Sequence, residues 1–169
     1  MSNTGNMSNF YQDVISIDPR FTSVDRINDP MLLEPVTQSA VRNIIASAAQ
    51  QGINLIVFET YRSQNRQAAL FAQGATTLQT VGVHHYGLAA DLVCLVSGEP
   101  SWRPSYAFLG PLAEANGLVW GGNWAEPNVT HSFVDMDHVQ RIAVDMQPQL
   151  FAGTFYPDNG YNPFSPTLA

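Results

Sequence analysis

The sequence contains a single cysteine, Cys94, among its 169 residues. One thiol excludes an intramolecular disulfide framework and a thiolate zinc cluster, so any metal site must use histidine and carboxylate ligands. Cys94 lies in the apolar run 92–96, which predicts a buried strand, and apolar surroundings suppress the reactive thiolate. We therefore expect a packed and chemically inert cysteine.

Basic residues are also scarce. Seven Lys plus Arg stand against 14 Asp plus Glu, and the formal net charge is −7. This balance opposes binding to nucleic acid phosphates and to an anionic membrane surface. The first eight residues have neither a basic segment nor an apolar run, and no later stretch approaches the roughly 18 apolar residues of a membrane span. We expect no nucleic-acid partner, no stable membrane association and no signal peptide.

The sequence shows no internal repeat, no linker and no Gly-x-Ser-x-Gly element, which removes the commonest serine hydrolase architecture. Hydrophobic residues make up 45% and charged residues 12% of the chain, which is typical of a globular protein. A chain of this length fits one domain. We expect a mobile segment at 1–12, one domain at 13–152, and a tail at 153–169, rich in Pro and aromatic residues, that lies on the surface or is mobile.

Apolar periodicity predicts the scaffold. Apolar residues at three- and four-residue spacing indicate a helix from Thr37 that ends near Gly52. The β-branched run 53–58 predicts a central strand, and Ser63 suits the N-cap of a second helix that closes at Gly74. The remaining expected elements are a strand at 92–96 that turns at 97–98, a helix at 104–116, a strand at 118–120 and a last strand at 131–140.

All four histidines fall in two short stretches that also contain aspartates. The first stretch holds His84, His85 and Asp91, and the second holds His131, Asp135, Asp137 and His138. A catalytic zinc needs three protein ligands and an open position, and imidazole nitrogens with carboxylate oxygens suit it. On spacing alone, hydrogen-bonded surface or core groups explain the same pattern, so both interpretations stay open at this point.

A longer set of motifs resembles one known family. The motif His-x-x-Gly-x-Ala-x-Asp at 84–91, followed by Asp-x-x-His at 135–138, is similar to the signature of the zinc D-alanyl-D-alanine carboxypeptidases and L-alanyl-D-glutamate endopeptidases. That family includes vancomycin-resistance carboxypeptidases and phage endolysins. Matches at 61–74 and at 120–124 occur in the family's order, and the resemblance spans residues 36–140. It implies an α+β fold of the hedgehog and D,D-peptidase type, with a small antiparallel sheet, flanking helices and a zinc site at the sheet face.

The resemblance also implies roles for individual residues. His84, Asp91 and His138 would bind one zinc ion, and Asp135 would be the general base that takes a proton from the attacking water. Arg62 resembles the arginine that binds the substrate carbonyl and its developing oxyanion. The implied substrate-binding residues are Ser63, Gln67, His85, Trp120 and Trp124.

Several of these roles have alternatives. Regular strand alternation would place Asp135 and Asp137 on one face and His138 on the other, so Asp137 competes as the base and the family spacing implies a local irregularity. Purely structural roles remain open for the other residues: an ion pair for Arg62, core packing for Trp120 and Trp124, and support of the site for His85 and His131.

The implied activity is hydrolysis of a stem-peptide amide bond in bacterial peptidoglycan, with L-alanyl-D-glutamate as the first choice and D-alanyl-D-alanine as the alternative. Gly82 stands where the family usually has a serine that helps hold the terminal carboxylate in the carboxypeptidase branch, which favours endopeptidase action. The resemblance to endolysins implies a monomer made in the bacterial cytoplasm that reaches the wall through a holin-type pore. A non-catalytic wall-binding or phage structural module is the alternative from another class.

Overall fold

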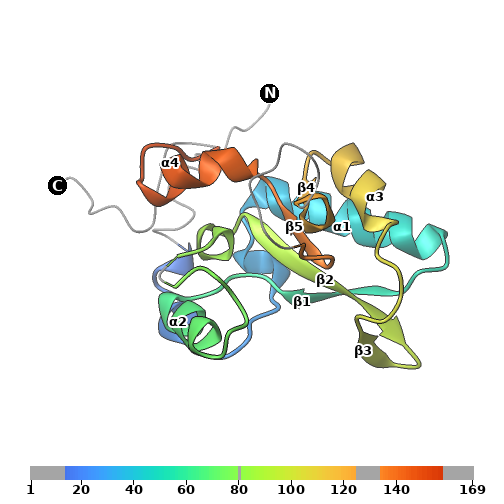
Figure 1. The fold of residues 1–169 in the computed structure, drawn as a ribbon, viewed down its shortest axis with the longest axis horizontal. Helices are drawn as coiled ribbons and strands as arrows, with labels where there is room; N and C mark the ends of the chain where they lie inside the picture. Colours follow the sequence, from blue (N-terminus) through green and yellow to red (C-terminus); the bar gives the residue numbers. More distant parts are fainter. Residues whose placement is uncertain (1–13, 80, 125–133, 158–169) are drawn as a thin grey trace.

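Residues 14–79, 81–124 and 134–157 are described by the computed structural model of this chain. They form an α+β fold in which a small antiparallel sheet is flanked by helices, as the family resemblance implies (Figure 1). The sheet order is β1-β2-β5-β4, and β3 pairs with the far end of β2. The strands are β1 (Leu55–Glu59), β2 (Ala89–Val96), β3 (Glu99–Ser101), β4 (Val119–Trp120) and β5 (His138–Gln140).

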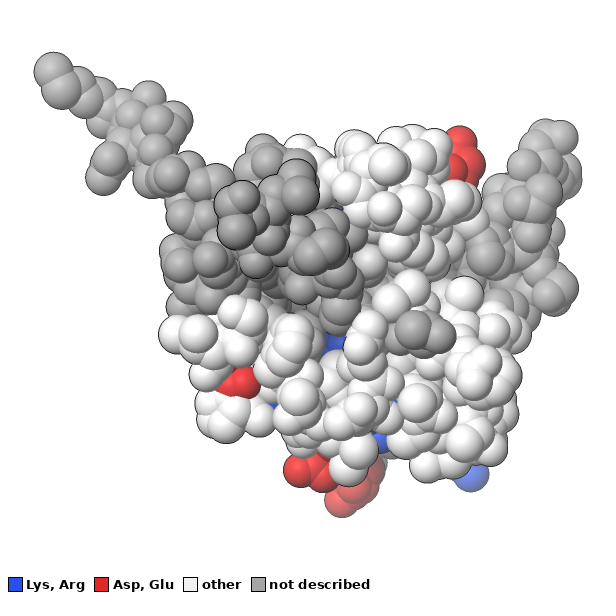
Figure 2. Space-filling view, turned by 90° about the vertical axis from the view of Figure 1, so that its left-hand side faces the viewer, with Lys and Arg blue, Asp and Glu red and all other residues white. Residues whose placement is uncertain are grey.

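Four α-helices surround this sheet in the part of the chain that the structure describes. They are α1 (Pro35–Gln50), α2 (Gln64–Ala72), α3 (Leu109–Ala115) and α4 (Gln147–Phe151). Figure 1 shows α2 and α4 at one end of the sheet and β3 at the other. Few charged side chains are visible on the face that carries α2 and α4 (Figure 2), which agrees with the low charged fraction of the sequence. Within the described ranges, none of the helices has the length and apolar character needed to cross a membrane.

Local sequence signals explain where the first two helices begin and end. The Glu34 carboxylate caps α1 by accepting a first-turn backbone N–H at 2.6 Å, and Ser63 caps α2 as predicted, accepting a first-turn N–H at 3.0 Å. Gly52 and Gly74 follow the two helices with φ angles of 78° and 73°. Glycine adopts this left-handed conformation without a steric penalty, so both helices end close to the predicted positions.

One face of the sheet is covered by α1 and α3 and carries an apolar cluster. Alternate residues of β2, namely Ala90, Leu92 and Cys94, belong to this cluster, as the two-residue period of a strand requires. Cys94 is therefore buried, as predicted. Val139 of β5 joins them from the neighbouring strand. Each large aliphatic side chain buried here stabilises the fold by about 1.5–3 kcal/mol relative to exposure.

A second apolar cluster supports the loop that leads into β2. It contains buried residues from several distant segments, among them Tyr61, Tyr86, Leu88, Ile142 and Leu150. Tyr156 also packs here, and its hydroxyl donates a hydrogen bond to the carbonyl oxygen of Tyr86 at 2.9 Å. This cluster fixes the backbone on both sides of the histidine-containing loop.

Some elements differ from their predicted extents. The helix predicted at 104–116 begins only at Leu109, because the buried Tyr106 hydroxyl accepts the N–H of Cys94 and donates to Ser101, which holds the preceding residues against the sheet. The strand predicted at 131–140 is reduced to His138–Gln140 in the described range, because residues 136–137 form a turn. The short elements β3 and α4 were not predicted. Segments 1–12 and 158–169 lie outside the described residues.

Candidate metal centre and cleft

The pairing of β2 with β5 brings together two of the predicted metal ligands. Asp91 and His138 are direct partners in the antiparallel register, followed by Ala90 with Val139. Directly opposed residues in such a pair have Cβ atoms about 4.5–5.5 Å apart. Since Ala90 and Val139 belong to the apolar cluster under α1 and α3, the side chains of Asp91 and His138 project from the other face.

The third predicted ligand comes from the loop before β2. His84 lies in a short 3₁₀-helix, Val83–Tyr86, which ends at Gly87. Gly87 has a φ of 67°, a left-handed conformation that reverses the backbone and that other residues rarely adopt. Ala89 and Ala90 are completely buried where the chain enters β2. The small residues of the motif therefore allow the tight backbone turn before β2 that directs the His84 side chain toward Asp91.

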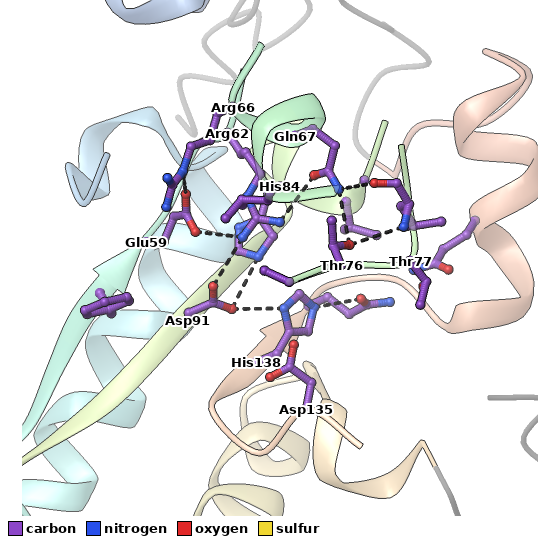
Figure 3. Close-up of a pocket in the computed structure, with 18 of the residues that line it drawn as sticks. Glu59, Arg62, Arg66, Gln67, Thr76, Thr77, His84, Asp91, Asp135 and His138 are labelled. Atoms are coloured by element: carbon purple, nitrogen blue, oxygen red, sulfur yellow. Dashed lines mark hydrogen bonds and ion pairs between the residues drawn. The ribbon is translucent and has the colours of Figure 1, made fainter. Parts of the chain in front are cut away.

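These three side chains converge on one carboxylate oxygen. Asp91 Oδ1 lies 3.3 Å from Nε2 of His84 and 3.1 Å from Nδ1 of His138, and Figure 3 shows the two imidazoles on either side of it. All three side chains are largely buried. The structure therefore places His84, Asp91 and His138 as a group able to hold a metal ion, with one donor atom from each residue.

Hydrogen bonds on the far sides of the imidazoles select the tautomers that metal binding requires. Nδ1 of His84 lies 2.8 Å from the carbonyl oxygen of Thr60, which can only accept, so this nitrogen carries the proton. Nε2 of His138 donates to Oε1 of Gln140 at 2.9 Å, and the Gln140 amide is oriented because its nitrogen donates to Ile142 at 2.7 Å. In the neutral form, both remaining ring nitrogens then direct lone pairs toward Asp91, which is the arrangement that orients metal-bound histidines.

The charges of the group are coupled. Burial disfavours the Asp91 carboxylate, but the two neighbouring imidazoles outweigh burial and hold its pKa well below the ordinary value. Burial likewise disfavours the charged form of His138, and the adjacent Asp91 carboxylate outweighs it, so the pKa of His138 is raised. Asp91 and His138 therefore stabilise each other's charged forms.

Glu59 is a site residue that sequence reasoning missed. The register between β1 and β2 shifts after Val57, so that Glu59, and not Phe58, opposes Asp91. Such a β-bulge re-aims a side chain and is frequent beside active sites. Glu59 is buried and accepts from Arg62 at 2.7 Å and from Arg66 at 2.9 Å. The only sequence signal was the spacing of one acidic and two basic residues at the end of the strand.

Arg62 lies between the metal-binding group and α2. Its guanidinium is 3.5 Å from Asp91 Oδ2 and donates to the side-chain oxygen of Gln67 at 3.3 Å, in addition to its bond with Glu59. Burial disfavours its charge, but Glu59 and Asp91 outweigh burial and raise its pKa. Its Nε is buried and has no hydrogen-bond partner among the residues described. Arg62 is thus a permanent cation held at the site by two carboxylates.

Asp135 and Asp137 lie in the turn before β5, which is the local irregularity that the motif spacing implies. The backbone N–H of Leu92 donates to Asp137 O at 2.8 Å, so pairing with β2 begins within the turn. Asp135 lines the cleft beside His138 (Figure 3), whereas Asp137 does not line it. Burial, and next the hydrogen bond with Asp135, raise the pKa of Asp137 to about 8. An aspartate with that pKa is largely protonated at neutral pH.

The cleft above the metal-binding group has a volume of about 300 Å³. Its wall includes Gln67 and Trp124, and the Trp124 ring lies 5.0 Å from that of His138. The lining also takes in residues of the loop after α2 and one from α4, namely Ala75, Thr76, Thr77, Leu78 and Gln147.

Three of the predicted substrate-binding residues lie elsewhere. Ser63 is fully buried as the cap of α2, and His85 is fully buried beneath the loop, so neither lines the cleft. Trp120 packs against Gly110, and its indole N–H donates to Met136 O at 2.7 Å. The structure therefore places these three side chains in supporting positions, as the structural alternatives for Trp120 and His85 allowed. His131 lies outside the described residues.

Solved structures define the class of this fold. The L-Ala D-Glu endopeptidase ChiX of Serratia marcescens superposes with a TM-score of 0.55 at 23% sequence identity, covering 70% of this chain and 86% of ChiX. VanYB in complex with D-alanine-D-alanine gives a TM-score of 0.52 at 15% identity, covering 71% and 77%. A VanY D,D-pentapeptidase in complex with Zn(II) gives 0.51, also at 15% identity, covering 71% and 78%. The fold is the D,D-peptidase type predicted from the motifs.

Among curated proteins, this chain is similar in sequence to two peptidases that are named for the L-alanyl-D-glutamate bond. The peptidoglycan L-alanyl-D-glutamate endopeptidase CwlK of Bacillus subtilis is 25% identical over 132 residues, which cover 67% of this chain and 75% of CwlK. The L-alanyl-D-glutamate peptidase of Listeria phage A118 is 30% identical over 109 residues, 62% of this chain but only 36% of that protein. No family model matches the chain. The chain thus resembles the carboxypeptidase and endopeptidase family that its motifs indicate.

Proposed function

We propose that this protein is a zinc-dependent peptidase that hydrolyses the L-alanyl-D-glutamate bond of peptidoglycan stem peptides. The observation that carries the proposal is the convergence of His84 Nε2, Asp91 Oδ1 and His138 Nδ1 at the floor of a cleft that also contains Asp135 and Arg62. The two curated relatives are peptidases of this bond by name.

The donor set fits zinc. Four-coordinate zinc with bonds of about 2.0–2.1 Å holds its ligand atoms roughly 3.3 Å apart, and the observed separations from Asp91 Oδ1 are 3.3 and 3.1 Å. Two imidazoles and one carboxylate leave a fourth position for water or substrate. When bound here, zinc supplies a Lewis acid that polarises the scissile carbonyl and lowers the pKa of water toward ~7.

Asp135 is the general base in this proposal. Its carboxylate lies within 4.8 Å of an oxygen of Asp91 and faces the cleft, where it takes a proton from the attacking water and returns it to the leaving amine nitrogen. Asp137 is the weaker choice, because it does not line the cleft and its carboxylate already accepts the indole N–H of Trp102. A protonated Asp137 instead donates to Asp135 and holds that carboxylate in place.

Arg62 stabilises the charge that develops on the carbonyl oxygen. Glu59 fixes the guanidinium from behind, so the donor is positioned before substrate arrives. Removal of a single oxyanion donor costs about 2.7–4 kcal/mol of transition-state stabilisation in other enzymes. Gln67 and Trp124 line the cleft and are the proposed contacts for the peptide.

The glycine at position 82 supports endopeptidase action over the carboxypeptidase alternative. A Cβ at Gly82 would lie 3.2 Å from Oε1 of Gln67, the atom that accepts from Arg62. A serine there would crowd this pair, so the site is arranged without the hydroxyl that would help hold a terminal carboxylate. The proposed partner is bacterial peptidoglycan, cut by a monomer that reaches the wall from the bacterial cytoplasm through a holin-type pore.

Digestion of purified peptidoglycan tests the activity and the bond together. We expect mass spectrometry to find new N-terminal D-glutamate in the released peptides, with no product after chelation and with recovery on addition of zinc. New C-terminal D-alanine would identify the carboxypeptidase alternative. Binding to the wall without any cleavage would identify the non-catalytic module.

Two variants separate metal binding from proton transfer. Asp135→Ala should keep the fold and one zinc per chain yet lose activity by about 10²–10⁴-fold, whereas His138→Ala should lose the metal as well. Metal content is measured by elemental analysis of the dialysed proteins. Parental activity in Asp135→Ala would reject the base assignment.

A further inference from the structure

Two aromatic side chains adjoin the cleft and have no part in the proposed hydrolysis. Phe58 is the extra residue of the β1 bulge and lines the cleft, and Trp102 follows β3 and is 53% exposed. Their ring centroids are 5.1 Å apart with an interplanar angle of 88°. We refer to Phe58 and Trp102 as the aromatic pair.

The aromatic pair is anchored although Trp102 is exposed and Phe58 is only half-buried. The Trp102 indole N–H donates to Oδ2 of Asp137 at 2.8 Å. The Arg26 guanidinium lies 3.8 Å from the centroid of the Phe58 ring and donates to the Phe58 carbonyl oxygen at 2.7 Å. Single exposed apolar residues are ordinary, but these contacts have already removed side-chain freedom that a ligand would otherwise have to restrict. The pair is therefore a preorganised surface next to the site.

The aromatic pair is also close to the reacting groups. Asp137, which bonds to Trp102, has a carboxylate oxygen within 4.8 Å of one on Asp91 and one on Asp135. The Trp102 indole N–H is therefore hydrogen-bonded to a carboxylate that itself lies beside the metal-binding group. Whatever part of a substrate rests on Trp102 must lie close to the bond that is cut.

The covalent structure of peptidoglycan indicates which part of the substrate would rest on Trp102. In peptidoglycan, the L-alanine of the stem is joined to the lactyl group of an N-acetylmuramic acid. The L-alanyl-D-glutamate bond is therefore one residue from the sugar, about 3.5 Å of extended chain, whereas the D-alanyl-D-alanine bond is four residues away, about 14 Å. Only the first cut brings a sugar ring beside the metal-binding group.

We propose that the aromatic pair is a sugar subsite that binds the N-acetylmuramic acid ring carrying the scissile stem, an inference that rests on the proposed endopeptidase function. The apolar C–H face of a pyranose packs against the electron-rich face of an indole, while its hydroxyl and acetamido groups stay in water at the exposed edge. Phe58, whose ring stands perpendicular to that of Trp102, lines the cleft, where the peptide would begin.

A pair of soluble substrates tests the subsite. One is the disaccharide-linked tetrapeptide, and the other is the same tetrapeptide carrying an N-lactyl group without the sugars. Values of kcat/KM are measured with the zinc-loaded parent, Trp102→Ala and Trp102→Phe. We expect the parent to prefer the sugar-bearing substrate by about tenfold, as one aromatic contact allows, and Trp102→Ala to lose that preference. Trp102→Phe should keep part of it, since it retains an aromatic face but has a smaller ring and no indole N–H.

The ratio between the two substrates distinguishes the subsite from a supporting role. If Trp102→Ala lowers both kcat/KM values by the same factor, Trp102 supports Asp137 or binds peptide, and the sugar subsite is overturned. Equal cleavage of both substrates by the parent overturns the subsite while the peptidase remains. If the parent cuts neither, the proposed function fails and the subsite with it. Circular dichroism and thermal unfolding confirm that the variants are folded.

Discussion

On β2, the residues that face α1 and α3 are Ala90, Leu92 and Cys94, whereas Asp91 between them faces the cleft. On β5, Val139 joins the apolar cluster, while His138 and Gln140 face the cleft. Alternate residues of the same two strands therefore point to opposite faces of the sheet, one apolar and one charged. Strand alternation lets the two faces change independently of each other.

The two faces also contribute differently to stability. Each apolar residue on the helix side stabilises the fold through burial alone. On the cleft side, the charged forms of Glu59, Asp91, Arg62 and His138 are disfavoured by burial, and only their mutual attraction outweighs that cost, so the loss of one partner would leave a buried charge unpaired. The helix side therefore stabilises the sheet residue by residue, whereas the contribution of the cleft side depends on the complete set of charged partners.

Adjacent substitutions on β2 give the strongest test of this contrast. Asp91→Ala removes the shared carboxylate and should reduce zinc binding and peptidoglycan cleavage to background. Leu92→Ala should lower the free energy of unfolding by about 2–5 kcal/mol and leave zinc content and activity per folded molecule unchanged. Elemental analysis, a turbidity assay and urea unfolding measure the three quantities. Loss of zinc from folded Leu92→Ala would show that the faces are not independent.

The second prediction concerns the two aspartates of the turn before β5. Asp135→Asn should lower kcat by about 10²–10⁴-fold, the usual contribution of a general base. Asp137→Asn keeps an oxygen that can accept from Trp102, so we expect a smaller loss. Both variants should retain zinc. The reverse ranking of the two variants would transfer the base assignment to Asp137.

The third prediction tests Glu59, which holds Arg62 at the cleft. Glu59→Gln removes the charge that fixes the guanidinium, and supporting residues of this kind change activity by about 10–100-fold. We expect kcat to fall and zinc content to persist. Glu99→Gln, the same change at an exposed position of β3, is the matched control and should behave as the parent. Equal activity of the two variants would remove Glu59 from the site.

The smallest expected effect is the pH dependence of stability without metal. The pKa values of Asp91 and Glu59 are lowered on folding, so their contribution is present above their ordinary values of 3.8 and 4.5 and is lost as the pH falls through the depressed values. The pKa of His138 is raised, so its contribution is complete below its ordinary value of 6.5 and is lost as the pH rises through the raised value. The pKa of Asp137 is raised from 3.8 to about 8, so its cost grows as the pH rises between these values. Chelated protein should therefore be most stable at about pH 5 and lose stability above it.

Zinc should reverse the trend on the alkaline side. Metal binding needs unprotonated imidazoles, so the rise in Tm on adding zinc should grow between pH 6 and pH 8. Differential scanning fluorimetry across this range, with zinc or with chelator, measures both curves. A chelated protein whose Tm increases steadily from pH 6 to pH 8 would contradict the coupling between His138 and Asp91.

The sequence predicted those elements whose signals are local. The apolar stripe of α1, the Ser63 cap of α2 and the turn at 97–98, where Ser97 and Gly98 have φ angles of 53° and 81°, lie within a few residues of their expected positions. Periodicity, capping and glycine placement depend on neighbouring residues and need no tertiary information. The convergence of His84, Asp91 and His138 was expected only through the resemblance, because bare spacing left a structural interpretation open.

Features that depend on long-range pairing were missed. Glu59 belongs to the site because a bulge shifts its register against β2, and nothing within residues 53–59 signals that bulge. Trp120 beside the Gly-Gly turn was expected at the cleft, but Gly110 of α3 allows its ring to pack inside. The extent of β5 was overestimated because its turn is set by contacts with β2 and with Gly121. Each of these features is decided by residues distant in the sequence.

The position of β5 has a consequence for how the protein matures. Among the strands that the structure describes, β5 is the last in sequence, yet it lies between β2 and β4 and carries His138. In a nascent chain emerging from the ribosome, His84 and Asp91 would be in place before His138. The second imidazole would join them only after residue 140 had been released and β5 had inserted into the sheet. Metal capture, and any hydrolysis that depends on it, would therefore wait for completion of the sheet, so that unfinished chains stay inactive.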